Sequence, residues 1–343
     1  MKAFGKIRLA ALCAAVCVLF MLCARGEAER GSVIVSLGDS YSSGEGNEPY
    51  YGQELPMAEK ADNGDWLAHR SRNAWPGMLR FPGTDGAAVL YRAEPGTETA
   101  GDTVWYFQAA SGAYTDHFYS RLRCPVRRGT VRRSGEEAYL EAQLSIFDTI
   151  PENGTDWVTL TLGGNDAGFI DLLTFCVTGV NVSDSRAREK TEEMWQKKEE
   201  MLRRKLTQAY RDIAARAGER ARIIVAGYPC LFSENGSGPL ISETEAQAAN
   251  DAVKRLNGLI RECVEKCAGE GISISFVSVE EVFDGHGAGS DDPYLYSFSF
   301  IPTGEELALP GVSCRSLHPN EKGQQAYARC VQAEIDRLSA EIP

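Results

Sequence analysis

Short apolar segments rich in β-branched residues recur along the chain and predict the strands of a buried sheet. Each holds about five residues, and in the clearest of them, residues 33–37 and 222–226, the apolar character is largely continuous rather than alternating. This pattern is typical of parallel strands that are covered on both faces. The predicted strands are residues 33–37, 104–108, 157–162, 222–226 and 272–277.

Apolar residues spaced three or four positions apart predict helices between and after these strands. The longest patterns span residues 189–217 and 243–268, and a last helix is expected from about 321 to 340. Strands alternating with helices predict a three-layer α/β/α sandwich around a parallel five-stranded sheet. We find no repeat or linker, so we expect a single domain over residues 29–343. Its long insertions would be residues 47–100, 113–135 and 284–316.

The N-terminus has the pattern of an export signal, residues 1–28. Three basic residues precede an uncharged apolar stretch over residues 9–24, and small residues suited to cleavage follow. That stretch is short for a membrane span. We therefore expect a secreted protein without a stable membrane span. An uncleaved anchor and a lipidated Cys23 are the alternatives.

Composition describes a globular protein: 343 residues, 43% of them hydrophobic and 24% charged. The net charge of −12 argues against nucleic-acid binding, because neutralising phosphates requires clustered Lys and Arg. An acidic chain also has no general attraction to anionic membranes. We expect a monomer that acts on a small molecule.

Seven of the ten cysteines lie beyond the predicted signal, and in an exported protein they tend to form disulfides. The odd number leaves at least one unpaired within the chain. Cys263 and Cys267 lie one helical turn apart but lack a companion Cys/His set at ligand spacing. We therefore predict neither a metal nor an organic cofactor. The seven are Cys124, Cys176, Cys230, Cys263, Cys267, Cys314 and Cys330.

Three polar positions carry the candidate chemistry. Ser40 follows the first predicted strand, Asn165 follows the 157–162 strand, and His318 precedes the last helix. The carboxyl ends of parallel strands meet at one edge of a sheet, so these segments are expected to converge. A serine nucleophile, a histidine base and an amide donor for an oxyanion are the parts of an ester-cleaving site. Asp39 is predicted to cap the helix that opens at Ser40.

The motifs Gly38-Asp39-Ser40, Gly163-Gly164-Asn165-Asp166 and His318-Pro319-Asn320 resemble those of the SGNH (GDSL) hydrolases. Further blocks resemble the secreted esterase/lipase subgroup typified by actinomycete enzymes. The resemblance implies an acyl-Ser40 intermediate, His318 as general base, and an oxyanion hole formed by Ser40, Gly112 and Asn165. The further blocks are residues 38–46, 69–71, 110–113 and 283–286.

Three positions depart from the pattern of that family. Many members carry Asp three residues before the histidine, where this chain has Arg315. By resemblance, the Arg315 main-chain carbonyl orients His318 in a Ser–His dyad; a carboxylate from Asp284, Asp291 or Asp292 is the competing possibility. The subgroup also often has cysteines where this chain has Ala68 and Ala110.

The sequence does not select one substrate. An ester or lipid substrate is expected, with an acetyl esterase acting on polysaccharide as the main rival. A non-catalytic glycan- or lipid-binding module on the same fold is the alternative outside enzymes, but it would not need Ser, Asn and His together. Alternating aromatic residues predict either a strand or an apolar lid, and these are Tyr294, Tyr296, Phe298 and Phe300.

Overall fold

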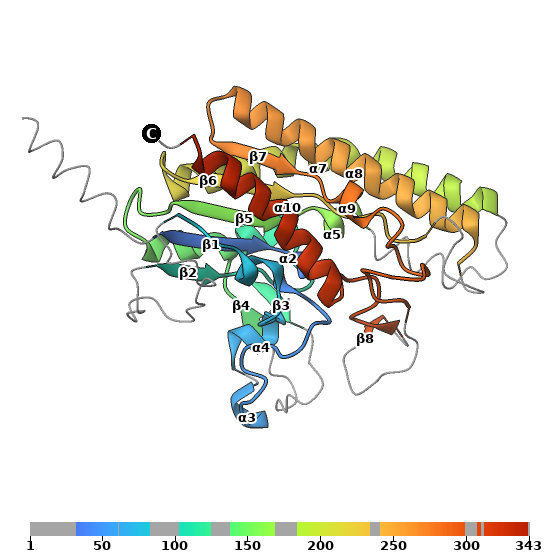
Figure 1. Cartoon of the computed structure of the whole chain (residues 1–343), viewed down its shortest axis with the longest axis horizontal. Helices are drawn as coiled ribbons and strands as arrows, with labels where there is room; N and C mark the ends of the chain where they lie inside the picture. The colour runs from blue at the N-terminus through green and yellow to red at the C-terminus, as the bar shows by residue number, and fades with distance from the viewer. Residues whose placement is uncertain are drawn as a thin grey trace, which may run out of the picture.

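Five parallel strands form the centre of the computed structural model, in the order β2-β1-β5-β6-β7 (Figure 1). All five predicted strands are confirmed, although β7 begins two residues later than expected. The strands are β1 Val33–Gly38, β2 Val104–Phe107, β5 Trp157–Thr161, β6 Arg222–Ala226 and β7 Ile274–Val277. The structure describes residues 32–60, 62–82, 103–124, 138–168, 184–233, 241–298, 307–309 and 312–341.

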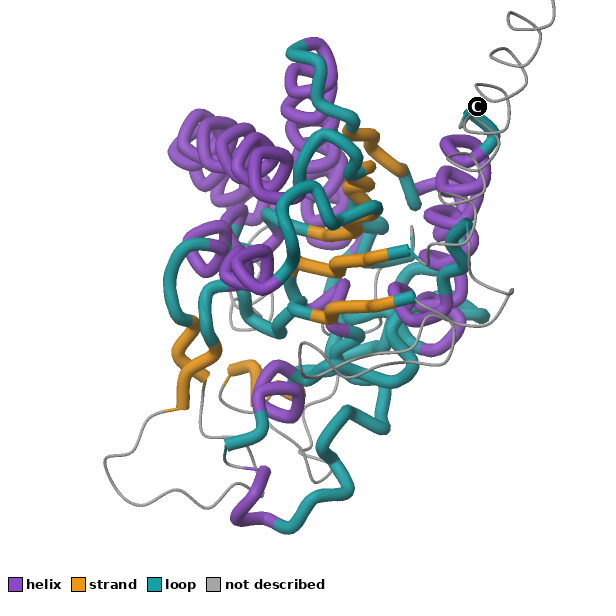
Figure 2. Tube along the Cα trace, turned by 90° about the vertical axis from the view of Figure 1, so that its left-hand side faces the viewer, coloured by secondary structure: helices purple, strands orange, loops and turns teal. Residues whose placement is uncertain are grey.

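The sheet lies between two layers of helices, which confirms the three-layer sandwich (Figure 2). On one face, α7 Asp184–Ala217 packs along α8 Glu243–Gly269. On the other, α10 Glu321–Ser339 covers β6 and β7 and contacts η1 Trp75–Met78. The central strands are almost fully buried because both faces are covered.

Side-chain caps fix where two of the predicted helices begin. Ser242 and Glu245 form a capping box at the start of α8, each satisfying an N–H that the helix leaves unpaired. The Asn320 side chain accepts from the N–H of Gly323 at the start of α10. Asn320 therefore fixes the helix that directly follows His318.

Short elements in the connections complete the fold. They are α2 Ser40–Ser43, α3 Met57–Lys60, α4 Gly64–Ala68, η2 Thr115–Phe118, β3 Leu122–Cys124, β4 Ala138–Leu140, η3 Gln143–Thr149, α5 Gly164–Ala167, α9 Glu280–Phe283, β8 Leu307–Leu309 and β9 Val312–Ser313. Ala68 and Ala110, which stand where the resemblance expects cysteines, are buried in a small apolar cluster beside the β3–β4 pair.

Several sequence predictions fall outside the described residues, including the signal over 1–28, Cys176 and Phe300. In the described part of the chain, no helix is both long and apolar enough to cross a membrane. Four cysteines in that part are thiols without a disulfide, so they lend no support to the predicted bridges. These are Cys230, Cys263, Cys267 and Cys330.

Candidate functional site

Ser40 is the first residue of α2, directly after the carboxyl end of β1. The turn between them requires Gly38, whose φ is +120° and whose absent Cβ would lie 2.3 Å from the Thr161 carbonyl oxygen. Gln143, which the sequence analysis did not identify, brackets Gly38 with two 2.8 Å hydrogen bonds to its N–H and carbonyl. The backbone that presents Ser40 is therefore fixed on both sides.

Asp39 is the N-cap of α2, as predicted. Its carboxylate is buried and accepts from the Tyr41 N–H at 3.1 Å, the Thr161 hydroxyl at 2.7 Å and the Tyr228 hydroxyl. Burial raises the pKa of the Asp39 carboxyl to about 6. The three hydrogen-bond donors lower this pKa, but their effect is smaller than that of burial. Asp39 thus links the turn that carries Ser40 to β5 and to the segment after β6.

Asn165 lies in α5, just past β5, and its side-chain amide donates to the Ala113 carbonyl at 2.8 Å. The neighbouring Asp166 accepts from both the N–H and the hydroxyl of Thr115, at 2.9 and 2.7 Å. These contacts hold the Gly112 loop against the Asn165 turn. The second N–H of the Asn165 amide remains for another acceptor.

Gly112 has φ +81°, a conformation that non-glycine residues rarely adopt, and no described atom lies within 4 Å of where its Cβ would be. The loop also joins the nucleophile turn, because the Ala110 N–H donates to the Gly38 carbonyl at 3.0 Å. The predicted Gly112 and Ser40 segments therefore belong to one hydrogen-bonded edge of the sheet.

His318 lies against Tyr41, with ring centroids 5.3 Å apart. The Tyr41 hydroxyl donates to the carbonyl of Leu317 at 2.8 Å. Leu317 has φ +61°, which is strained for a leucine, and its N–H is held by the Tyr296 carbonyl at 2.9 Å. Tyr41, the residue next to Ser40, thus holds the loop that carries His318.

Burial lowers the pKa of His318, so the imidazole is neutral near pH 7. The charge of Glu45 and the carbonyl groups of Cys314 and Ser316 oppose this shift. Those carbonyls lie beside the ring, yet neither meets the buried Nδ1 with hydrogen-bond geometry, and no other described group does. These two main-chain carbonyls are therefore the nearby candidates to accept a hydrogen bond from Nδ1.

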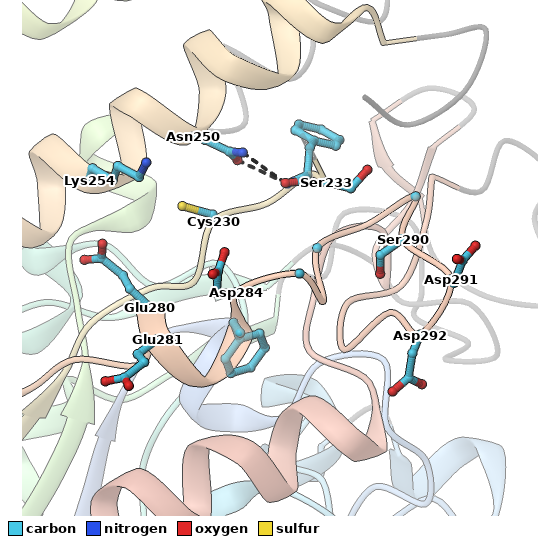
Figure 3. A pocket seen from close by; sticks show the side chains of 15 residues that line it. Cys230, Ser233, Asn250, Lys254, Glu280, Glu281, Asp284, Ser290, Asp291 and Asp292 are labelled. Carbon is cyan, nitrogen blue, oxygen red and sulfur yellow. Dashed lines mark hydrogen bonds between the residues drawn. The ribbon is translucent and has the colours of Figure 1, made fainter. Parts of the chain in front are cut away.

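The Arg315 carbonyl, predicted from the sequence as that acceptor, receives the backbone N–H of His318 at 3.0 Å. Its second lone pair can still accept another donor. The competing carboxylates of Asp284, Asp291 and Asp292 are exposed and line a cavity of about 840 Å³ beyond β6 and β7 (Figure 3). Asp292 forms an ion pair with Lys322, which lowers the pKa of that carboxyl. Among the described residues, none of the three contacts His318.

The sequence analysis assigned no role to a second group of polar residues, although two of them, Glu45 and His69, lie in blocks that carried the resemblance. Glu45 is fully buried and meets Nδ1 of His69 at 2.8 Å. The Tyr50 hydroxyl donates to the same carboxylate at 3.1 Å, and its ring stacks on His69. The sulfur of Cys314 lies within 4.8 Å of ligand atoms of both Glu45 and His69. Only the fold shows that these distant positions meet.

A parallel sheet with a serine after its first strand and a histidine before its last helix is the arrangement that the resemblance to the SGNH hydrolases implied. A model of the GDSL-like lipase/acylhydrolase family matches residues 36–326, so the chain belongs to that family. It is a hydrolase of carboxylic esters.

Two curated relatives support this assignment. "Lipase 1" of Streptomyces coelicolor is 29% identical over 290 residues, covering 84% of this chain and 81% of the relative. "Lipase" of Streptomyces rimosus is 28% identical over 292 residues, with the same coverage.

Solved structures share the fold. The extracellular lipase of Streptomyces rimosus superposes with a TM-score of 0.58 at 26% identity, covering 88% of this chain and 99% of that chain. Phospholipase A1 of Streptomyces albidoflavus NA297 gives the same TM-score and coverage at 24% identity. Because the phospholipase is only 24% identical, its similarity to this chain shows a shared fold alone.

Proposed function

We propose that this protein is an exported serine esterase or lipase that works through an acyl-Ser40 intermediate. The observation that carries the proposal is the contact of Tyr41 with the His318 loop, because it holds the nucleophile and base segments together. Residues 29–343 would form one catalytic domain after removal of residues 1–28.

In the proposed reaction, the Ser40 hydroxyl oxygen attacks the ester carbonyl while His318 takes the hydroxyl proton. His318 then gives that proton to the leaving alcohol, and the acyl group stays on Ser40. Water, activated by the same imidazole, releases the acid and restores the serine. The lowered pKa of His318 supports its role as base, because a base must be unprotonated at the working pH.

Negative charge on the tetrahedral intermediate would be held by the backbone N–H groups of Ser40 and Gly112 and by the Asn165 amide. The hydrogen bonds of Asn165 to Ala113 and of Asp166 to Thr115 support this assignment, because they fix two of the donors relative to each other. Donors fixed in advance need no reorganisation when the charge develops.

For the orientation of His318, we propose a Ser–His dyad in which a main-chain carbonyl faces Nδ1. The carbonyls of Cys314 and Ser316, which oppose the shift of the His318 pKa, are the favoured acceptors. The Arg315 carbonyl is the alternative, because it can accept a second donor besides the backbone N–H of His318. The exposure of Asp284, Asp291 and Asp292 supports the dyad over a triad.

The names of the two Streptomyces relatives favour a lipid ester as substrate. An acetyl esterase acting on polysaccharide is the rival within this class, and a binding module without catalysis is the rival outside it. We expect the enzyme to act as a monomer, without a cofactor in the chemical step.

Hydrolysis of p-nitrophenyl esters from acetyl to palmitoyl, with the mature protein and its Ser40→Ala variant side by side, tests the proposal. Activity should vanish in Ser40→Ala and persist in Ser43→Ala, a matched change on the same short helix. The chain-length optimum separates an acetyl esterase from a lipase. Full activity in folded Ser40→Ala would refute the serine mechanism. No activity of the folded wild type on any of these esters would favour a narrow glycan esterase or the binding module.

A further inference from the structure

Three side chains with metal-ligand chemistry converge close to the proposed site. One carboxylate oxygen of Glu45, one ring nitrogen of His69 and the sulfur of Cys314 all lie within 4.8 Å of one another. Glu45 and His69 are 0% and 4% exposed, and Cys314 is half-buried. The proposed ester hydrolysis uses none of these three side chains.

The backbone brings these residues together through a close approach of two segments. Gly46 has φ +87°, and a Cβ there would lie 2.8 Å from the Cβ of Arg315. The Asn47 side-chain amide donates to the Pro319 carbonyl at 2.7 Å and joins the same two segments. Glycine at position 46 therefore lets the chain after α2 lie directly against the loop that carries Cys314.

We propose that Glu45, His69 and Cys314 bind one zinc ion. A thiolate, an imidazole and a carboxylate form a three-ligand set that suits Zn²⁺ and leaves a fourth position for water. Calcium and magnesium prefer shells of oxygen ligands and do not fit this set. The charge also balances, because Glu45 and the Cys314 thiolate together neutralise the metal in a buried place.

Small movements complete the coordination. Tetrahedral bonds of about 2.0–2.3 Å place ligand atoms roughly 3.3–3.8 Å apart. The His69 and Glu45 atoms, now 2.8 Å apart, must therefore separate slightly. Neutral His69 binds through Nδ1 as the tautomer protonated at Nε2, and the thiol proton of Cys314 leaves to solvent.

The surroundings supply the outer contacts that metal ligands require. The Tyr50 hydroxyl and the Gly46 N–H both donate to the Glu45 carboxylate, each at 3.1 Å. The Tyr50 ring stacks on His69, with centroids 4.4 Å apart. Such contacts orient a ligand, and losing one typically weakens metal affinity about 10- to 100-fold.

The whole mature chain, residues 29–343, should be prepared free of metal and titrated with Co²⁺ and Zn²⁺. We expect one equivalent of cobalt to bind with a thiolate-to-metal charge-transfer absorption, and zinc to displace it. Failure of the wild-type protein to bind either ion would overturn the proposal, whatever any variant does.

Variants then locate the ion. Cys314→Ser should lose the charge-transfer absorption, whereas Cys230→Ser, which changes a half-buried thiol elsewhere, should keep it. Tyr50→Phe keeps the ring stack and should weaken zinc affinity about 10- to 100-fold. An unchanged absorption in Cys314→Ser, or its loss in Cys230→Ser, would overturn the assignment. Ser40→Ala keeps all three ligands and should bind zinc like the wild type, so this test stands apart from the esterase proposal.

Discussion

The hydroxyl of Tyr41 donates a 2.8 Å hydrogen bond to the carbonyl of Leu317. This bond joins the residue after the proposed nucleophile to the residue before the proposed base, across 276 positions of sequence. Leu317 has a strained positive φ, so its conformation depends on such contacts. The bond predicts that Tyr41 affects catalysis through the position of His318.

Tyr41→Phe should lower kcat about tenfold, a fold-change equal to about 1.4 kcal/mol of transition-state free energy. It should also reduce the free energy of unfolding by about 1–3 kcal/mol, because a buried carbonyl loses its donor. Steady-state kinetics with p-nitrophenyl esters and urea unfolding measure the two effects.

Tyr327→Phe is the matched control, since the Tyr327 hydroxyl also donates a buried 2.8 Å bond to a carbonyl, that of Gly227. Tyr327→Phe should lower the free energy of unfolding about as much as Tyr41→Phe does, and should keep kcat within about twofold of wild type. Equal losses of kcat in both variants would show a general structural effect rather than positioning of His318.

Asn165→Ala should lower kcat by about 10²–10³-fold, with KM nearly unchanged, because an oxyanion donor acts mainly in the transition state. Thr115→Val removes one bond from Asp166 and leaves the Asn165 amide intact, so it should have a much smaller effect on kcat. Measuring kcat and KM for both variants separates loss of the donor from loosening of the loop. A kcat within threefold of wild type in Asn165→Ala would exclude the side chain as an oxyanion donor.

Asp39 should make the stability depend on pH. Its pKa is about 6 in the folded state and near 3.8 when unfolded, so the folded state binds a proton more tightly. This contribution to stability is complete below about pH 4 and is lost as pH rises through 6. The difference of about two pKa units is worth up to about 3 kcal/mol.

Urea unfolding of the wild type and of Asp39→Asn, at several pH values from 4 to 8, measures this contribution. Asparagine does not titrate, so the stability of the wild type relative to Asp39→Asn should fall as pH rises from 4 to 7. A pH-independent difference between the two proteins would show that Asp39 keeps the same pKa on folding.

The sequence predicted much of the fold because apolar runs and helical spacing are local signals. β1, β5, β6, α7 and α8 lie close to their predicted bounds for this reason. Ser40, Asn165 and His318 could also be found locally, since each follows a strand or precedes a helix.

The contacts among these residues were not predictable in the same way. Tyr41 meets Leu317, and Glu45 meets His69 and Cys314, only because the chain folds back across the sheet edge. No spacing in the sequence encodes those distances. The acceptor for His318 stays a prediction for a related reason, since a loop's backbone conformation decides which carbonyl faces the ring.

The proposed dyad predicts that carboxylates near the site are dispensable for catalysis. Asp284→Asn, Asp291→Asn and Asp292→Asn should each leave kcat within about threefold of wild type, whereas removing the carboxylate of a true triad costs about 10⁴-fold. Asp292→Asn also breaks the ion pair with Lys322, so Lys322→Ala serves as its control for loop stability. Arg315→Ala should likewise be mild, because only backbone atoms of this loop are proposed to act on His318. A loss of about a thousandfold in one aspartate variant, with its control unaffected, would replace the dyad by a triad.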